Sequence, residues 1–148
     1  MENSVRASKL RAYIMTIISE IDQNYKQVNF NYLSNDVSNY SLDKIPTEKE
    51  TESWIIGDII HRDVYSFRSR MNYSAEVLSN ITNIGFFETF EKKIKDNNEN
   101  GILPDIAGIE SIKCLNTGTF VSASSNTAEF DIQIEIRYRD VEDVQPSI

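Results

Sequence analysis

The sequence AEFDIQIEIRYR at residues 128–139 separates its apolar and polar side chains between alternate positions. Apolar residues fill every even position up to Tyr138, whereas charged or amide residues fill every odd position up to Arg139. Because successive side chains of a strand point to opposite faces, this alternation predicts a long strand of antiparallel type with one buried and one solvated face. The solvated face carries both signs of charge at regular spacing, which suits a self-complementary protein surface better than a ligand pocket.

Further strands are expected on both sides of the chain's centre. Two precede the long strand directly, at residues 109–115 and 119–123, and each is followed by a short polar turn. An apolar hairpin is expected at residues 54–60, with Gly57–Asp58 as its turn, because glycine at the first central position suits a type II′ turn. Its return strand is expected to run to about Met71. Tyr65 and Phe67 are placed on one face of that strand, and Val64, Arg68 and Arg70 on the other.

Three helices are expected from apolar spacing and end signals. Ser4 is expected to cap the first helix. Gly85 interrupts a second apolar pattern, so a central pair of helices is expected, beginning after Ser74 and ending in the polar run at residues 96–101. The apolar stripe of the first helix comprises Leu10, Ile14, Ile17, Ile18 and Ile21.

This order of elements predicts an α+β domain, in which a mostly antiparallel sheet packs against an N-terminal helix and a central pair of helices. A length of 148 residues suits a single domain spanning 1–148. Residues 34–53 are expected to form an extended loop around a weak strand at 40–43, and a short strand is expected at 28–32. Residues 140–148 are expected to form a flexible tail.

Composition narrows the class of function. A net charge of −8 argues against nucleic acid as a binding partner, since phosphate contacts need clustered Lys and Arg. No apolar run approaches the roughly 20 residues that span a bilayer, and the N-terminus lacks the apolar core of a signal peptide, so we expect a cytosolic protein without a membrane partner. The single cysteine excludes an internal disulfide and a cysteine-cluster zinc site.

Few residues of this sequence are candidates for a catalytic role. His61 is the only histidine, and Asp63 lies two residues further along the same strand face, as a base and its orienting carboxylate would. No nucleophile motif supports that reading, and a surface pair is the better interpretation. Cys114 is interpreted as a small buried hydrophobe. Neither a nucleotide cradle nor a calcium loop occurs, so we expect no cofactor, no metal site and no enzymatic activity.

A basic stripe lies on the return strand of the hairpin. Arg68 and Arg70 share one strand face, and Arg62 shares it with them. On a chain of net charge −8, this stripe is interpreted as a partner for the acidic strand of a neighbouring copy in preference to a DNA site.

Three segments, in this order and spacing, resemble a known family. They are VYSFRSRMNYSAEVLSNITNIGFFETF at 64–90, the helix exit NGILP at 100–104, and the pair IESIKCLNTGTFVSAS at 109–124 and NTAEFDIQIEIRYR at 126–139. The family is that of the small tail-completion proteins, also filed as minor capsid or tail terminator proteins, of phages and phage-tail-like particles of Gram-positive bacteria. The apolar hairpin at 54–60 departs from the family's pattern.

The resemblance implies a structural subunit of the virion tail, assembled in the cytoplasm of the host bacterium. Tail terminators are α+β subunits that close into a ring, usually a hexamer, on the head-proximal end of the tail tube. The ring ends polymerisation of the tube protein and offers a docking surface to the head connector or, in contractile particles, to the end of the sheath. DNA only passes through the lumen, where six copies of −8 would discourage it from sticking.

Two sets of residues are candidates for the contacts that this function needs. An alternating charged strand face suits a ring interface between different patches of identical copies, and an apolar hairpin beside a long loop suits an arm that clasps a tube or sheath subunit. The candidate ring interface comprises Arg62, Arg68, Arg70, Glu129, Asp131, Glu135 and Arg137. The candidate docking arm comprises Glu48, Glu50, Trp54, Ile55, Ile56, Ile59 and Ile60.

Three alternatives stay open at this point. A head–tail connector, or neck adaptor, would bind the portal side in place of the tube. A small hydrolase or nuclease would use His61 and Asp63. A stand-alone binding module would act without a ring.

Overall fold

The computed structural model describes residues 3–21, 27–30, 33, 39–46, 52–53, 59–72, 77–124 and 127–139. Within these residues, the chain forms two helices and seven strands, which make one sheet. The elements are α1 (Asn3–Ile21), β1 (Gln27–Phe30), β2 (Asn39–Ile45), β3 (Glu52–Ser53), β4 (Ile59–Asn72), α2 (Val77–Glu99), β5 (Ile109–Cys114), β6 (Thr119–Ser124) and β7 (Thr127–Arg139).

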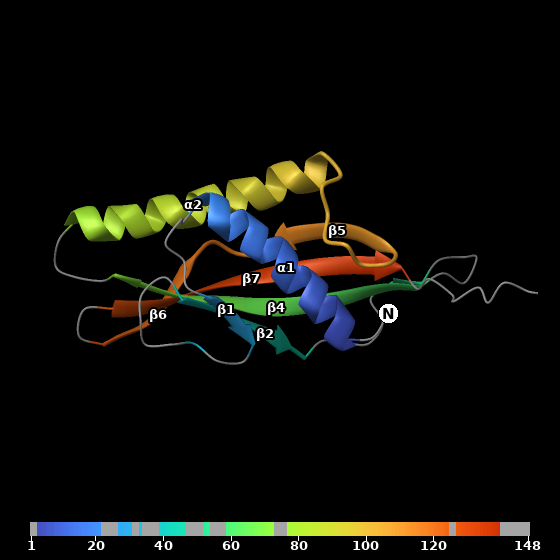
Figure 1. Ribbon diagram of the computed structural model, residues 1–148, viewed down its shortest axis with the longest axis horizontal. Coiled ribbons are helices and arrows are strands. Elements are labelled where there is room, and N and C mark those ends of the chain that lie inside the picture. Colours follow the sequence, from blue (N-terminus) through green and yellow to red (C-terminus); the bar gives the residue numbers. More distant parts are fainter. Residues whose placement is uncertain are drawn as a thin grey trace, which may run out of the picture.

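The two longest strands, β4 and β7, form the centre of the sheet (Figure 1). The main strand order is β1-β2-β4-β7-β5, with β3 paired to β4 and β6 paired to β7. The two long strands are antiparallel over thirteen residue pairs, from Ile60 opposite Arg139 to Asn72 opposite Thr127. The predicted α+β class is confirmed, but the sheet is mixed, because β1 pairs with β2 in parallel.

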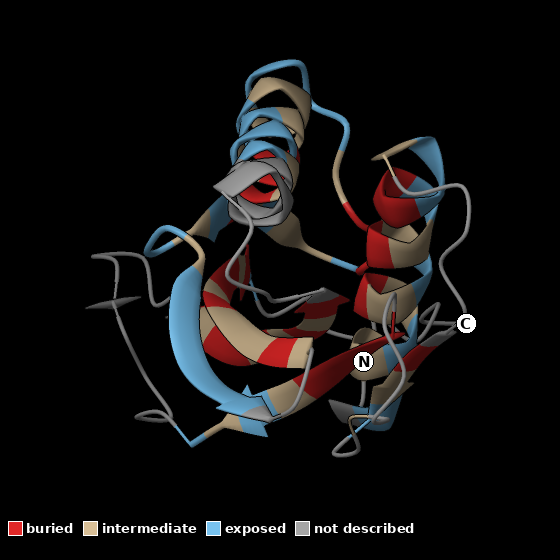
Figure 2. Ribbon diagram, turned by 90° about the vertical axis from the view of Figure 1, so that its left-hand side faces the viewer, coloured by how far each residue is buried: buried red, intermediate tan, exposed pale blue. Residues whose placement is uncertain are grey.

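Both helices lie on the same side of the sheet (Figures 1 and 2). Their apolar side chains meet the even-numbered residues of β7, where Ile132, Ile134 and Ile136 are fully buried. The predicted alternation of β7 is therefore confirmed on its buried face. The predicted stripe of α1 is confirmed as well, since Leu10, Ile14, Ile17 and Ile18 are buried in the same core and Ile21 packs against it.

The central pair of helices was a wrong prediction, because α2 is one continuous helix through Gly85. Glycine costs only about 1 kcal/mol in a helix interior. Burial of Phe87, Phe90 and Ile94 in the core outweighs that penalty.

The end of α2 was predicted correctly, and its geometry explains why. Gly101 has a φ of 73°, the left-handed conformation that glycine adopts without a Cβ clash. The amide of Ile102 donates to the carbonyl of Asn97 at 2.8 Å, and the amide of Gly101 donates to that of Asn98 at 3.3 Å. This pair of bonds is a Schellman motif, which satisfies the carbonyl groups at a helix end.

Several expected boundaries differ from the observed ones. The helix α1 begins at Asn3, so Ser4 lies inside it and does not cap it. The expected loop at 34–53 contains the seven-residue strand β2, longer than the weak strand predicted there. At the hairpin, Ser53 pairs with Ile59 and Glu52 with Ile60. The predicted turn at Gly57–Asp58, the helix start at Ser74 and the tail at 140–148 lie outside the described residues.

Candidate functional site

The sheet face opposite the helices carries most of the charged side chains that the sequence singled out. We call it the open face. It is formed by the odd-numbered residues of β7, the even-numbered residues of β4 and their row partners in β2 and β5. Arg68 lies opposite Asp131, and Arg70 lies opposite Glu129. All seven residues of the candidate ring interface lie on the open face, namely Arg62, Arg68, Arg70, Glu129, Asp131, Glu135 and Arg137.

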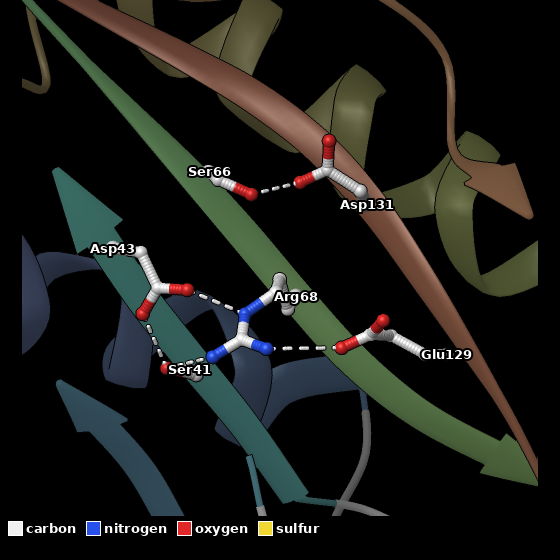
Figure 3. A network of polar contacts seen from close by, with 6 residues as sticks. All are labelled: Ser41, Asp43, Ser66, Arg68, Glu129 and Asp131. Carbon is white, nitrogen blue, oxygen red and sulfur yellow. Dashed lines mark hydrogen bonds and ion pairs between the residues drawn. The ribbon is translucent and has the colours of Figure 1, made fainter. Parts of the chain in front are cut away.

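Arg68 is the centre of one network on the open face (Figure 3). Its guanidinium contacts Asp43 at 2.5 Å and Glu129 at 3.0 Å, so one cation joins acids of β2 and β7 across β4. Ser41 donates to Asp43 at 2.8 Å and accepts from Arg68 at 3.5 Å. Beside this network, the hydroxyl of Ser66 donates to Asp131.

Glu135 is the centre of a second network on the same face. Its carboxylate is hydrogen-bonded by Arg62, contacts Arg137 at 3.1 Å and lies 3.6 Å from the ammonium of Lys113. Its side chain is only 2% exposed. Burial alone would raise the pKa of this carboxyl, but hydrogen bonds from Arg62 and Arg137 and the charge of Lys113 outweigh burial, so the pKa lies below its usual value.

These networks change the interpretation of the basic stripe. The stripe was predicted to pair with the acidic strand of a neighbouring copy, but Arg68 already pairs with Glu129, and Arg62 with Glu135, in the same chain. Most charges of the open face are thus paired within the chain, and its arginines are not a set of cations without acids. A partner of this face would meet arginines and carboxylates that are already held in place.

The candidate docking arm is only partly within the described residues. Glu48, Glu50, Trp54, Ile55 and Ile56 lie outside them. The backbone of Ile59 and Ile60 belongs to β4. Ile60 is buried.

A buried polar cluster lies on the helix side of the sheet, around Asp63. This carboxylate accepts from the hydroxyl of Tyr138 at 3.1 Å and from the guanidinium of Arg6 at 3.3 Å. The ammonium of Lys44 lies 3.6 Å away. Arg6 also lies over the Tyr138 ring, 4.4 Å from its centroid. The cluster therefore fastens the start of α1 to the two central strands.

The placement of Asp63 corrects the expectation of a surface pair. Asp63 is 5% exposed, and His61 stacks on the ring of Tyr138 with centroids 5.4 Å apart. Both residues share the odd-numbered side of β4 with the buried Tyr65 and Phe67, so the strand period could have placed them correctly. With three donors around it, Asp63 serves as an anchor of the fold.

Tyr65 provides a test of this cluster, because its hydroxyl is buried without a hydrogen bond among the described residues. Burial raises the pKa of Tyr65 to about 12, so the phenol stays protonated near neutral pH. An unsatisfied buried polar group is unfavourable. We expect Tyr65→Phe to raise the free energy of unfolding by about 1 kcal/mol in urea titrations.

Tyr138→Phe is the matched control, since it deletes the same atom from a hydroxyl that donates to Asp63. A hydrogen bond to a charged group contributes about 1.5–3 kcal/mol, so this variant should lose stability by that order. Equal effects of the two substitutions would contradict the assignment of Asp63 as the anchor.

Cys114 and the carboxylates were the remaining candidates for chemistry. Burial and the nearby Glu91 raise the pKa of the Cys114 thiol to about 12, so the thiol is protonated near neutral pH. The described residues contain no group of three or more His, Cys, Asp or Glu placed to hold a metal ion. Neither of the two described helices is long and apolar enough to cross a bilayer.

No known family model and no curated protein matches this chain.

Proposed function

We propose that this chain is a structural subunit of a phage tail or phage-tail-like particle, which forms a ring and caps the head-proximal end of the tail tube. The sequence resemblance suggests this function. Its segments at 64–90, 100–104, 109–124 and 126–139 cover most of β4, most of α2, its Schellman exit and the strands β5 to β7. These elements form most of the sheet and one of the two helices.

The observation that carries the proposal is the one-sided architecture. Both helices cover the same side of the sheet, and the charged side chains of the other side are fixed by internal ion pairs. Fixed arginines and carboxylates lose little conformational freedom when another protein docks, so such a face suits protein contacts. The donors that hold Asp63, from Arg6 and Tyr138, come from the core side of the sheet.

Capping in this proposal is a matter of competing affinities. The ring binds the last tube ring more tightly than another tube subunit does, and its opposite side differs from a tube subunit, so elongation stops. The partners are therefore other copies of this chain, the tube protein, and the head connector or the sheath end. DNA only passes through the lumen of the ring.

Deletion of the gene from a strain that produces the particles tests the proposal. Electron microscopy should show tubes longer than normal, and supplying the protein from a plasmid should restore their length. Tubes of normal length without heads would favour a neck adaptor. Tubes of normal length with heads attached would overturn both assignments.

His61→Phe is a matched variant for that experiment. The phenyl ring keeps the stack on Tyr138 but has no nitrogen for proton transfer. We expect this variant to restore tube length fully. Failure to do so with a folded protein would favour the hydrolase or nuclease alternative.

A further inference from the structure

Two edge strands of the sheet, β6 and β1, share features that set them apart from the central strands. At the edge that it forms together with β5, β6 (TFVSAS) has neither a charged residue nor a proline, and it pairs only with β7 among the described strands. Phe120 and Val121 are 48% and 52% exposed. Charges and prolines are two of the features by which natural edge strands avoid pairing with another strand, and β6 has neither of them.

The opposite edge, β1 (QVNF), is likewise free of charged residues and proline. Val28 is buried in the core, but Phe30, on the same strand face, is 41% exposed. Arg11 donates to the carbonyl oxygen of Val28 at 2.7 Å, which fixes β1 to α1 and occupies one of its acceptors.

The strand registers place β1 and β6 at the same position along the strand direction, so that their residues lie in the same rows across the sheet. Val28 pairs with Tyr40, which is connected through Ser69 and Phe130 to Phe120. One row further on, Asn29 is connected in the same way to Thr119. An edge-to-edge contact that repeats by rotation alone needs both edges at one height, and this sheet meets that condition.

The strand directions also match. Within one chain, β1 runs parallel to β2 and β7, whereas β6 runs opposite to β7. Copies related by rotation about an axis along the strands would therefore bring β6 of one copy antiparallel to β1 of the next. Phe120 and Phe30 would then be diagonal neighbours on the helix side, at a distance that aromatic side chains bridge.

We infer that β6 of one copy pairs with β1 of a second copy, so that the sheet continues from subunit to subunit. The contact is heterologous, and its repetition gives a ring when the rotation from copy to copy closes. The absence of charge from both strands avoids repulsion at the contact between chains of net charge −8. This inference deepens the proposed function, since it names the surfaces that form the proposed ring.

Cysteine cross-linking tests the contact directly. In a Cys114→Ala background, Asn29→Cys and Thr119→Cys place one thiol on each edge in the same row. Residues opposite each other in an antiparallel pair have Cβ atoms about 4.5–5.5 Å apart, close enough for a disulfide after a small adjustment. Mild oxidation of the purified protein should give a ladder of dimers, trimers and larger species up to a closed ring, all of which reductant converts to monomer.

A matched pair of controls identifies the surface. Asn29→Cys with Lys113→Cys, on the exposed part of β5, should stay monomeric on oxidation. A single Thr119→Cys variant that forms dimers would reveal pairing of β6 with itself and overturn the inference, as would a failure of the paired variant to cross-link.

A second measurement does not depend on disulfide geometry. Phe120→Lys adds a protective charge to the edge and should reduce the mass measured by light scattering to that of a monomer. Leu115→Lys, also at an exposed apolar residue but outside β6, should leave the oligomer intact. An oligomer that survives Phe120→Lys would count against the contact.

These results separate the inference from the proposed function. A cross-linked ring from a protein whose deletion leaves tube length unchanged would refute tail capping and keep the edge contact. Overlong tubes in the deletion strain, with no cross-link between Asn29→Cys and Thr119→Cys, would refute the edge contact alone.

Discussion

Replacing Ile134 with aspartate is expected to abolish the cooperative unfolding transition of this protein. Ile134 is fully buried at the centre of β7, between Tyr65 of β4 and Cys114 of β5. The substitution puts a carboxylate into the apolar core without a cation to pair it. The loss should exceed about 4 kcal/mol, a large part of the 5–15 kcal/mol that holds a typical domain folded.

Circular dichroism during a urea titration checks this prediction, and Ile134→Val is its control. The valine variant removes one methylene from the same place and should lose about 1 kcal/mol with an unchanged slope. A folded Ile134→Asp variant with a transition near that of the parent would show that β7 does not present its even-numbered residues to the core.

The sequence was sufficient for the elements whose periodicity is long and uninterrupted. Alternation over twelve residues leaves one register for β7, because a slip by one residue would turn every isoleucine toward solvent. The stripe from Leu10 to Ile18 determined the buried side of α1 in the same way. The end of α2 was predictable since Gly101 follows a polar run and supplies the left-handed residue that the exit needs.

Elements decided by tertiary contacts were less predictable. The glycine at position 85 suggested a break, but the helix continues because Phe87 and Phe90 on its next turn are buried against the sheet. The length of β2 was underestimated, because its sequence alternates only weakly. The strand is stabilised by its seven residue pairs with β4. Asp63 was predicted at the surface because its charge was given more weight than its position in the alternation of β4, whose odd-numbered residues face the core.

The pairing on the open face illustrates a further limit. Alternation placed the seven candidate residues on one face, and the structure confirms that placement. Which acid meets which base depends on the register between strands that are far apart in sequence. Arg68 reaches Asp43 and Glu129 only because β4 lies between β2 and β7. Without that strand order, a contact between copies was the simpler interpretation of the same charges.

Glu135→Lys is expected to destabilise the monomer itself, by about 3–5 kcal/mol. The open face appeared solvated in the sequence, so this reversal would have been expected to affect only contacts between copies. In the structure, the carboxylate is buried and three cations surround it, from Arg62, Lys113 and Arg137. A lysine there removes their common partner and adds a fourth positive charge. Urea titration at pH 7 measures the loss.

Glu135→Gln tests the same network through its pH dependence. The pKa of Glu135 is lower in the folded chain than its ordinary value of 4.5, so its ionised form stabilises the fold above that pH. This contribution is lost as the pH falls through the lower, folded-state pKa. We therefore expect Glu135→Gln to be less stable than the parent at pH 7, and the gap to narrow steadily below about pH 4.5. A gap that stayed constant with pH would mean that the three cations do not hold this carboxylate ionised, and that shape alone decides the effect of the substitution.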